Sequence, residues 1–175
     1  MVRSFNGKTP RIAESAYVSE SAYVVGDVEI GEDSSIWPGA VIRGDFASIK
    51  IGRSCAIEDN CVIHGGSPTS PEDDLIIGDM VIMGHGSVVN CHKIGDNVLI
   101  GMNATILHDA EIGNSCIISA GSLVGPGMKI PDRSFVAGVP GEIKGAPSSK
   151  QLAWTKKGFQ HIYVDLGRKY KEQGL

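Results

Sequence analysis

The chain of 175 residues contains five histidines, and three of them, His64, His85 and His92, lie close together in the sequence. Imidazole is the commonest metal ligand in proteins, and a catalytic zinc ion takes three protein ligands and keeps one open position. A histidine on its own is more often a surface side chain or one held by hydrogen bonds. Three within one short segment instead favour a metal site.

A regular six-residue repeat surrounds these histidines. Every sixth residue from 94 to 136 is a β-branched aliphatic, and the residue four places after each is mostly small. Helices and plain strands have shorter periods, so a strict six is typical of a parallel β-helix built from hexapeptides. Each aliphatic residue then fills the interior of one flat side. The repeating positions are Ile94, Ile100, Ile106, Ile112, Ile118, Val124, Ile130 and Val136.

Three breaks disturb the repeat, which begins at Ile12. The phase slips by three residues at 43–46, a loop rich in Gly, Pro and acidic residues occupies 65–74, and one residue is missing between Met83 and Ile94. Such breaks are places where polar side chains can be set on a rigid scaffold. The clustered histidines lie at or near them. His64 directly follows the inward-facing Ile63, so we expect it to point outward.

The repeat ends near residue 138, and a helical pattern follows. Ser149 is a plausible N-cap for this helix. The sequence therefore predicts an all-β domain at 1–147, a parallel β-helix, and a C-terminal α-helix at 148–175 packed on the outside of the coil. The apolar residues at helical spacing are Leu152, Phe159, Ile162, Tyr163, Leu166 and Tyr170.

Composition excludes several classes of protein. The net charge of −4 gives no sign of a nucleic-acid partner. No apolar run approaches the ~20 residues that a membrane helix needs. Residues 1–10 have no long apolar core like that of a signal peptide, so we expect a cytoplasmic protein without a membrane partner.

The four cysteines are also informative. Cys55, Cys61 and Cys116 fall at the small interior position of a hexapeptide, so we interpret them as buried apolar residues. Cys91 lies outside that pattern and next to His92. It remains a candidate for a reactive thiol, although nothing in the sequence marks it as an activated thiolate.

An ordered set of motifs resembles the γ-class carbonic anhydrases and their close relatives, over nearly the whole chain. The set is Arg43-Gly44-Asp45, Glu58-Asp59 ahead of His64, Gly84-His85-Gly86, Ile100-Gly101-Met102-Asn103, and Gly138-Val139-Pro140-Gly141 before a C-terminal helix. The resemblance implies a left-handed parallel β-helix of hexapeptide repeats and a homotrimer. It also implies a metal between two subunits, bound by two histidines of one chain and one of its neighbour.

The resemblance places His64 and His85 on the first two ligand positions of the family. The third position, five residues after the second, is Asn90 here, and the nearest histidine is His92. Asn is a poor zinc ligand compared with imidazole. We therefore expect a rearranged segment in which His92 completes the site, or else a site with two histidines and an amide. Glu58 stands where the family usually has Gln.

The activity implied by the resemblance is reversible hydration of carbon dioxide to bicarbonate. The cofactor would be zinc or another divalent cation such as iron or cobalt, which makes hydroxide available at neutral pH. Arg43 and Asp45 are expected near the subunit interface, as an ion pair or in catalysis. Glu58 is expected to act as a base or to accept a hydrogen bond from a metal ligand, and Asn103 to orient carbon dioxide.

Two other functions fit the same coil. A hexapeptide-repeat acyltransferase would use an outward histidine as general base at a subunit interface and would need no metal. A non-catalytic trimeric scaffold would keep the fold without the third ligand, and Asn90 is the residue that supports this alternative. The fold alone does not distinguish among the three.

Overall fold

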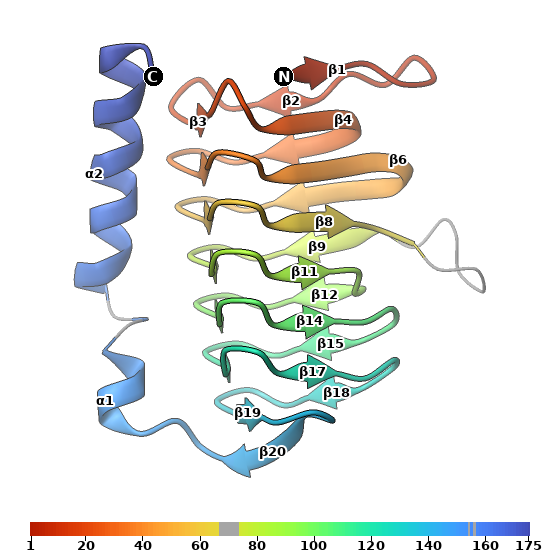
Figure 1. Cartoon of the computed structure of the whole chain (residues 1–175), viewed down its shortest axis with the longest axis vertical. Helices are drawn as coiled ribbons and strands as arrows, with labels where there is room; N and C mark the ends of the chain where they lie inside the picture. Colours follow the sequence, from red (N-terminus) through yellow and green to blue (C-terminus); the bar gives the residue numbers. More distant parts are fainter. Residues whose placement is uncertain (67–73, 154, 156) are drawn as a thin grey trace.

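The structure, a computed structural model, describes residues 1–66, 74–153, 155 and 157–175, except for the side chains of 157–160. Most of the loop expected at 65–74 therefore lies outside the described residues, as does the side chain of Phe159. Short strands stack in parallel along one axis, as Figure 1 shows. The β-helix of hexapeptide repeats expected from the sequence is confirmed.

One side of the coil, which we call the helix face, is a stack of seven parallel strands with an antiparallel strand, β20, at its end. Adjacent strands match every hexad anchor with the anchor one coil away, as in Met83 opposite Ile100. The strands are β3 (Tyr17–Val18), β5 (Ser35–Ile36), β7 (Ala56–Ile57), β10 (Ile82–Met83), β13 (Leu99–Ile100), β16 (Ile117–Ile118), β19 (Phe135–Ala137) and β20 (Glu142–Gly145).

The two other sides are joined by the long strands β4 (Tyr23–Ile30) and β6 (Val41–Ile51), which turn the corner between them. The beginning of β6 pairs with β8, and its end pairs with β9. The histidine face continues from β8 (Val62–His64) through β11 (Val88–Val89), β14 (Thr105–Ile106) and β17 (Leu123–Val124). The charged face comprises β2 (Arg11–Ile12), β9 (Leu75–Ile77), β12 (Lys93–Ile94), β15 (Glu111–Ile112) and β18 (Lys129–Ile130).

The core is a single column of aliphatic side chains inside the coil. Every anchor from Ile94 to Val136 is buried, as the repeat predicts. Burial of a Val, Leu or Ile side chain contributes roughly 1.5–3 kcal/mol relative to leaving it exposed. Ile12 and Val18, in the first coil, are only partly buried because they lie near the open end of the column.

The N-terminal end of the coil extends further than the repeat suggested. β1 (Val2–Arg3) pairs in parallel with β4, although no hexad anchor precedes Ile12. The terminal ammonium group donates to the carbonyls of Glu20 and Ala22. These bonds satisfy backbone groups that would otherwise be left open at the end of the coil.

Two helices follow the coil: α1 (Ser149–Leu152) and α2 (Lys157–Gln173). The expected N-cap at Ser149 was wrong by one residue, because Ser148 accepts from the backbone of Gln151 and forms a capping box with it. Helix α2 returns along the coil, and the C-terminus lies beside the N-terminal end (Figure 1). Neither helix in the described part of the chain combines the length and apolar character that a membrane-spanning segment requires.

An aromatic cluster fixes α2 on the helix face. Tyr170 packs edge-on against Trp37, with ring centroids 5.1 Å apart, and Tyr17 and Tyr163 extend the cluster. The helix backbone comes close to the sheet at Gly167, where a Cβ atom would lie 3.3 Å from the Cβ of Ser35. Glycine at this position allows the close approach, because a Cβ atom would make the helix or the sheet shift by a few tenths of an ångström.

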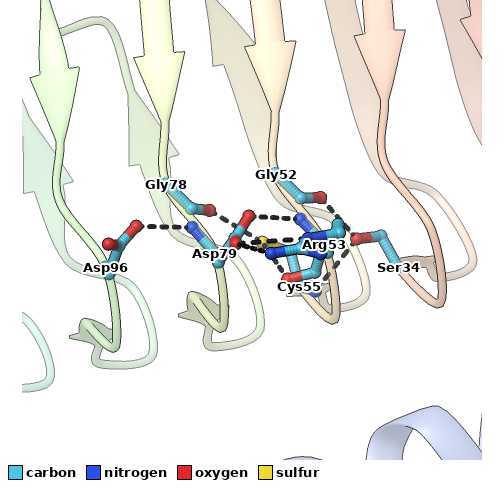
Figure 2. Close-up of polar contacts among 7 residues, drawn as sticks. All are labelled: Ser34, Gly52, Arg53, Cys55, Gly78, Asp79 and Asp96. Carbon is cyan, nitrogen blue, oxygen red and sulfur yellow. Dashed lines mark hydrogen bonds and ion pairs between the residues drawn. The ribbon is translucent and has the colours of Figure 1, made fainter.

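At one corner, polar side chains link the coils, as Figure 2 shows around Asp79. The Asp79 carboxylate accepts from the backbone N–H of Arg53 at 2.8 Å and from its guanidinium Nη2 at 2.9 Å. The backbone N–H of Asp79 in turn donates to Asp96 at 2.8 Å, and Asp96 and Asn114 continue the series. The backbone hydrogen bond from Arg53, reinforced by its guanidinium, lowers the pKa of Asp79.

A tight corner of this kind excludes side chains at the glycine that precedes each polar residue. We expect Gly78→Ala to destabilise the fold by roughly 1–3 kcal/mol, because its Cβ would lie 2.8 Å from the backbone carbonyl carbon of Gly95, which cannot turn away as a side chain can. Gly125→Ala is the matched control, since nothing lies within 4 Å of its Cβ position. Denaturant unfolding followed by circular dichroism measures both variants. Equal stability of the two would contradict this account of the corner.

Candidate metal centre

His64 and Asn90 lie side by side on the histidine face. The register pairs Ile63 with Val89, so the residues that follow, His64 and Asn90, stand next to each other on adjacent strands. Both side chains point outward, because the preceding aliphatic residues point inward. Nδ2 of Asn90 is 3.3 Å from Nδ1 of His64. The third ligand position of the sequence analysis is therefore occupied by an amide beside the first imidazole.

Arg43 and Asp45 lie beside His64, at the corner where β6 turns. Oδ1 of Asp45 is 3.1 Å from Nε2 of His64, and Nε of Arg43 is 3.3 Å from Oδ2 of Asp45. Nη2 of Arg43 also lies 3.3 Å from Nε2 of His64, so this ring nitrogen has both a donor and an acceptor beside it. The expected ion pair between Arg43 and Asp45 is present, and it holds the His64 ring.

His85 lies at the other edge of the histidine face. The chain runs from β10 on the helix face through His85 to β11, and reaches Asn90 only after β11. The His85 ring is half exposed, with Nδ1 2.8 Å from Asp59 and Nε2 3.1 Å from Glu58. The backbone N–H of His85 also donates to Oε2 of Glu58 at 2.9 Å. Two carboxylates therefore hold this imidazole.

Glu58 is buried, with 4% of its surface exposed. Its carboxylate also accepts a hydrogen bond from a residue whose role at this site the sequence analysis did not identify. The hydroxyl of Tyr163, on α2, donates to Oε1 of Glu58. Burial and the hydrogen bond to Glu58 raise the pKa of Tyr163, so it stays a donor at neutral pH. Helical spacing marked Tyr163 as apolar and inward-facing, but no signal in the sequence paired it with a residue 105 positions away.

Asn103 lies one coil below His85. Its backbone N–H donates to the carbonyl of His85 at 3.0 Å, and its side-chain Oδ1 occupies the space that a Cβ on Gly86 would fill. Among the candidates from the sequence, Asn103 therefore lies with Glu58 and His85. Arg43, Asp45 and His64 form the other cluster, together with Asn90.

His92 has no contact with His64 among the interactions of the described residues. It follows the corner after Asn90, and its Nδ1 is buried with no hydrogen-bond partner in the described part of the chain. Cys91, which lies between Asn90 and His92 in the sequence, is part of the core. Burial raises the pKa of the Cys91 thiol to about 12, so it is protonated at neutral pH. Its burial assigns Cys91 to core packing rather than to the reactive thiol that the sequence left open.

A single chain does not assemble a metal site from the residues that the structure describes: no group of three or more His, Cys, Asp and Glu side chains is arranged to hold an ion. His64 and His85 are separated by the strand β11. Two imidazoles on opposite edges of one face can meet only if a second copy of the chain brings one edge against the other.

Comparison with known proteins first gives the class. The family model "Bacterial transferase hexapeptide (six repeats)" matches residues 9–44 and 92–126. A crystal structure of a putative acetyltransferase from Bacillus cereus is 36% identical, with a TM-score of 0.91, and the match covers 98% of this chain and 97% of that one. The chain is thus a hexapeptide-repeat β-helix protein.

Curated relatives then give the family. A carbonic anhydrase of Geobacillus kaustophilus is 40% identical over 98% of this chain and 91% of its own length. A probable carbonic anhydrase of Methanocaldococcus jannaschii is 49% identical over 75% of this chain and 80% of its own. Gamma carbonic anhydrase 2 of Arabidopsis thaliana mitochondria is 31% identical over 92% of this chain, which spans only 58% of that longer protein. The chain belongs to the γ-carbonic anhydrase-like family of hexapeptide-repeat proteins.

The burial of the thiols has a direct chemical consequence. All four cysteines are buried, and burial raises the pKa of each thiol, so little thiolate is present at pH 8. We expect no rapid reaction of the native protein with Ellman's reagent and four equivalents after unfolding in guanidinium. One fast equivalent that disappears in Cys91→Ser would contradict the assignment of Cys91 to the core.

Proposed function

We propose that the protein catalyses the reversible hydration of carbon dioxide at a metal site formed between two subunits of a homotrimer. One observation carries the proposal. His64 and Asn90 lie at one edge of the histidine face and His85 at the other, so contact between copies places His85 of one subunit near His64 of the next. A symmetric ring repeats this contact at every interface.

The surface between the two edges supports an interface between copies. Outward side chains of the histidine face form an aliphatic column that no helix covers in the described structure: Val41, Val62, Val88 and Leu123, with Tyr23 above them and Thr105 within the column. Along the charged face, outward residues instead form cross-strand ion pairs, such as Arg11 with Glu29 at 2.9 Å and Lys129 with Glu111 at 3.1 Å. Exposed apolar columns favour protein contacts, whereas paired charges favour solvent.

The residues present fit a divalent cation. Metal-bound histidines usually donate their second ring nitrogen to a carboxylate or carbonyl. His64 has Asp45 at one nitrogen. His85 has a carboxylate at each ring nitrogen, Glu58 at Nε2 and Asp59 at Nδ1, so one of these two contacts must open for that nitrogen to bind the cation. In this proposal, His64 and Asn90 of one subunit and His85 of its neighbour hold the cation. An amide oxygen binds zinc-class ions less well than imidazole, so we expect weaker binding than with three histidines.

A divalent cation at this position would supply a strong Lewis acid, which lowers the pKa of water to about 7. Water adds to carbon dioxide to give bicarbonate and one proton. The chain's own side chains have defined tasks: Asp45 and Arg43 hold the His64 ring, and Glu58 holds His85. Asp59, partly exposed beside His85, is placed to pass the released proton to solvent. Asn103, below His85, is proposed to orient carbon dioxide.

Two alternatives remain as outcomes of the test. The acyltransferase alternative needs an outward histidine but no metal, and the scaffold alternative needs neither. The experiment is stopped-flow hydration of carbon dioxide by the zinc-, iron- and cobalt-loaded protein, with His64→Ala as the inactive control. No rate above buffer from a fully loaded protein would reject the proposal in favour of the scaffold. A protein that binds no metal would turn attention to acyl transfer.

Asn90→His separates the two accounts of the third ligand. Because Asn90 lies beside His64, a third imidazole there is expected to tighten zinc binding by about tenfold or more and to raise the hydration rate. Equilibrium dialysis with zinc measures the affinity. His92→Asn is the matched control and is expected to leave zinc binding unchanged. Loss of metal in His92→Asn, with no gain in Asn90→His, would instead make His92 the ligand.

A further inference from the structure

We infer that Tyr163 is a positioning residue: its hydroxyl, delivered by α2, fixes Glu58 and through it the backbone and ring of His85. The inference rests on the proposed function only where it treats His85 as a ligand. The contacts themselves belong to the single chain. They make the C-terminal helix a working part of the site rather than only a cover for the helix face.

The two oxygens of Glu58 have different partners. Oε2 accepts from the backbone N–H of His85 and lies 3.1 Å from its Nε2. On the other side, Oε1 receives the Tyr163 hydroxyl, its one side-chain donor within the described residues. A buried carboxylate is costly unless donors satisfy it. Without the hydroxyl, one oxygen of a nearly fully buried carboxylate would have no donor there, and the side chain would be free to turn away from His85.

The position of the hydroxyl is set by packing that is independent of Glu58. The Tyr163 ring meets Trp37 edge-on, with centroids 6.2 Å apart, and Trp37 also packs against Tyr17 and Tyr170. Close to Tyr163 in the helix, Val164 is buried. Because several rings hold the helix, the phenol stays in place whether or not the carboxylate is there.

Removal of the hydroxyl should therefore leave the helix docked but loosen His85. In Tyr163→Phe the ring still packs on Trp37, and only the hydrogen bond to Glu58 is lost. The backbone N–H of His85 donates to that same carboxylate, so its hydrogen exchange reports directly on the position of Glu58. This readout needs no metal and no activity.

The experiment compares amide hydrogen exchange at His85 in wild type, Tyr163→Phe and Tyr170→Phe, without added metal. Tyr170→Phe is the matched control, because it removes a hydroxyl from the same helix and the same aromatic cluster without touching Glu58. We expect exchange at His85 to accelerate at least about tenfold in Tyr163→Phe and to stay at the wild-type rate in Tyr170→Phe. Wild-type exchange in a folded Tyr163→Phe protein would overturn the inference.

Glu58→Gln supplies a second route in case Tyr163→Phe folds poorly. If the hydroxyl acts through Glu58, the double variant exchanges no faster at His85 than the faster single variant, and additive acceleration would contradict the inference. The visible spectrum of bound cobalt then extends the test to the site. Tyr163→Phe should weaken cobalt binding at least about tenfold, whereas failure of wild type to bind cobalt would count against the proposed function alone.

Discussion

The structure depends on one constraint: each flat side of the coil must send an aliphatic side chain into a narrow interior. That requirement fixes a period of six and brings anchors such as Met83 and Ile100 into register from one coil to the next. Because inward residues are fixed, the residues beside them are fixed as outward columns. The histidine face, with its aliphatic column and its polar edges, is a consequence of the same stacking.

The proposed site exploits the rigidity of this scaffold. His64 and Asn90 follow two stacked anchors and so remain adjacent, while His85 precedes the strand that separates it from them. Each imidazole already has a carboxylate beside it, which orients the ring before any cation arrives. Relatives named carbonic anhydrases support the proposed activity. Asn90, in place of a third imidazole, is the feature of this chain expected to weaken metal binding.

Much of this could be predicted from the sequence, because the repeat is local. The hexad anchors, the outward direction of His64 and the C-terminal helix follow from spacing alone. It was harder to predict which residue lies beside His64. Val89 pairs with Ile106 and Lys93 with Glu111, so the missing residue falls after Val89, and Asn90 rather than His92 stays alongside His64. The contact between Tyr163 and Glu58 depends on how α2 docks, which no local pattern encodes.

The central claim is that a cation lies between His64 of one subunit and His85 of its neighbour. Anomalous diffraction at the cobalt edge, from crystals of cobalt-loaded protein, tests it most directly. The account predicts one anomalous peak at each subunit interface of a trimer, within coordination distance of both imidazoles and of Asn90. Peaks only elsewhere on the surface, or a fully loaded monomer with no shared site, would contradict it.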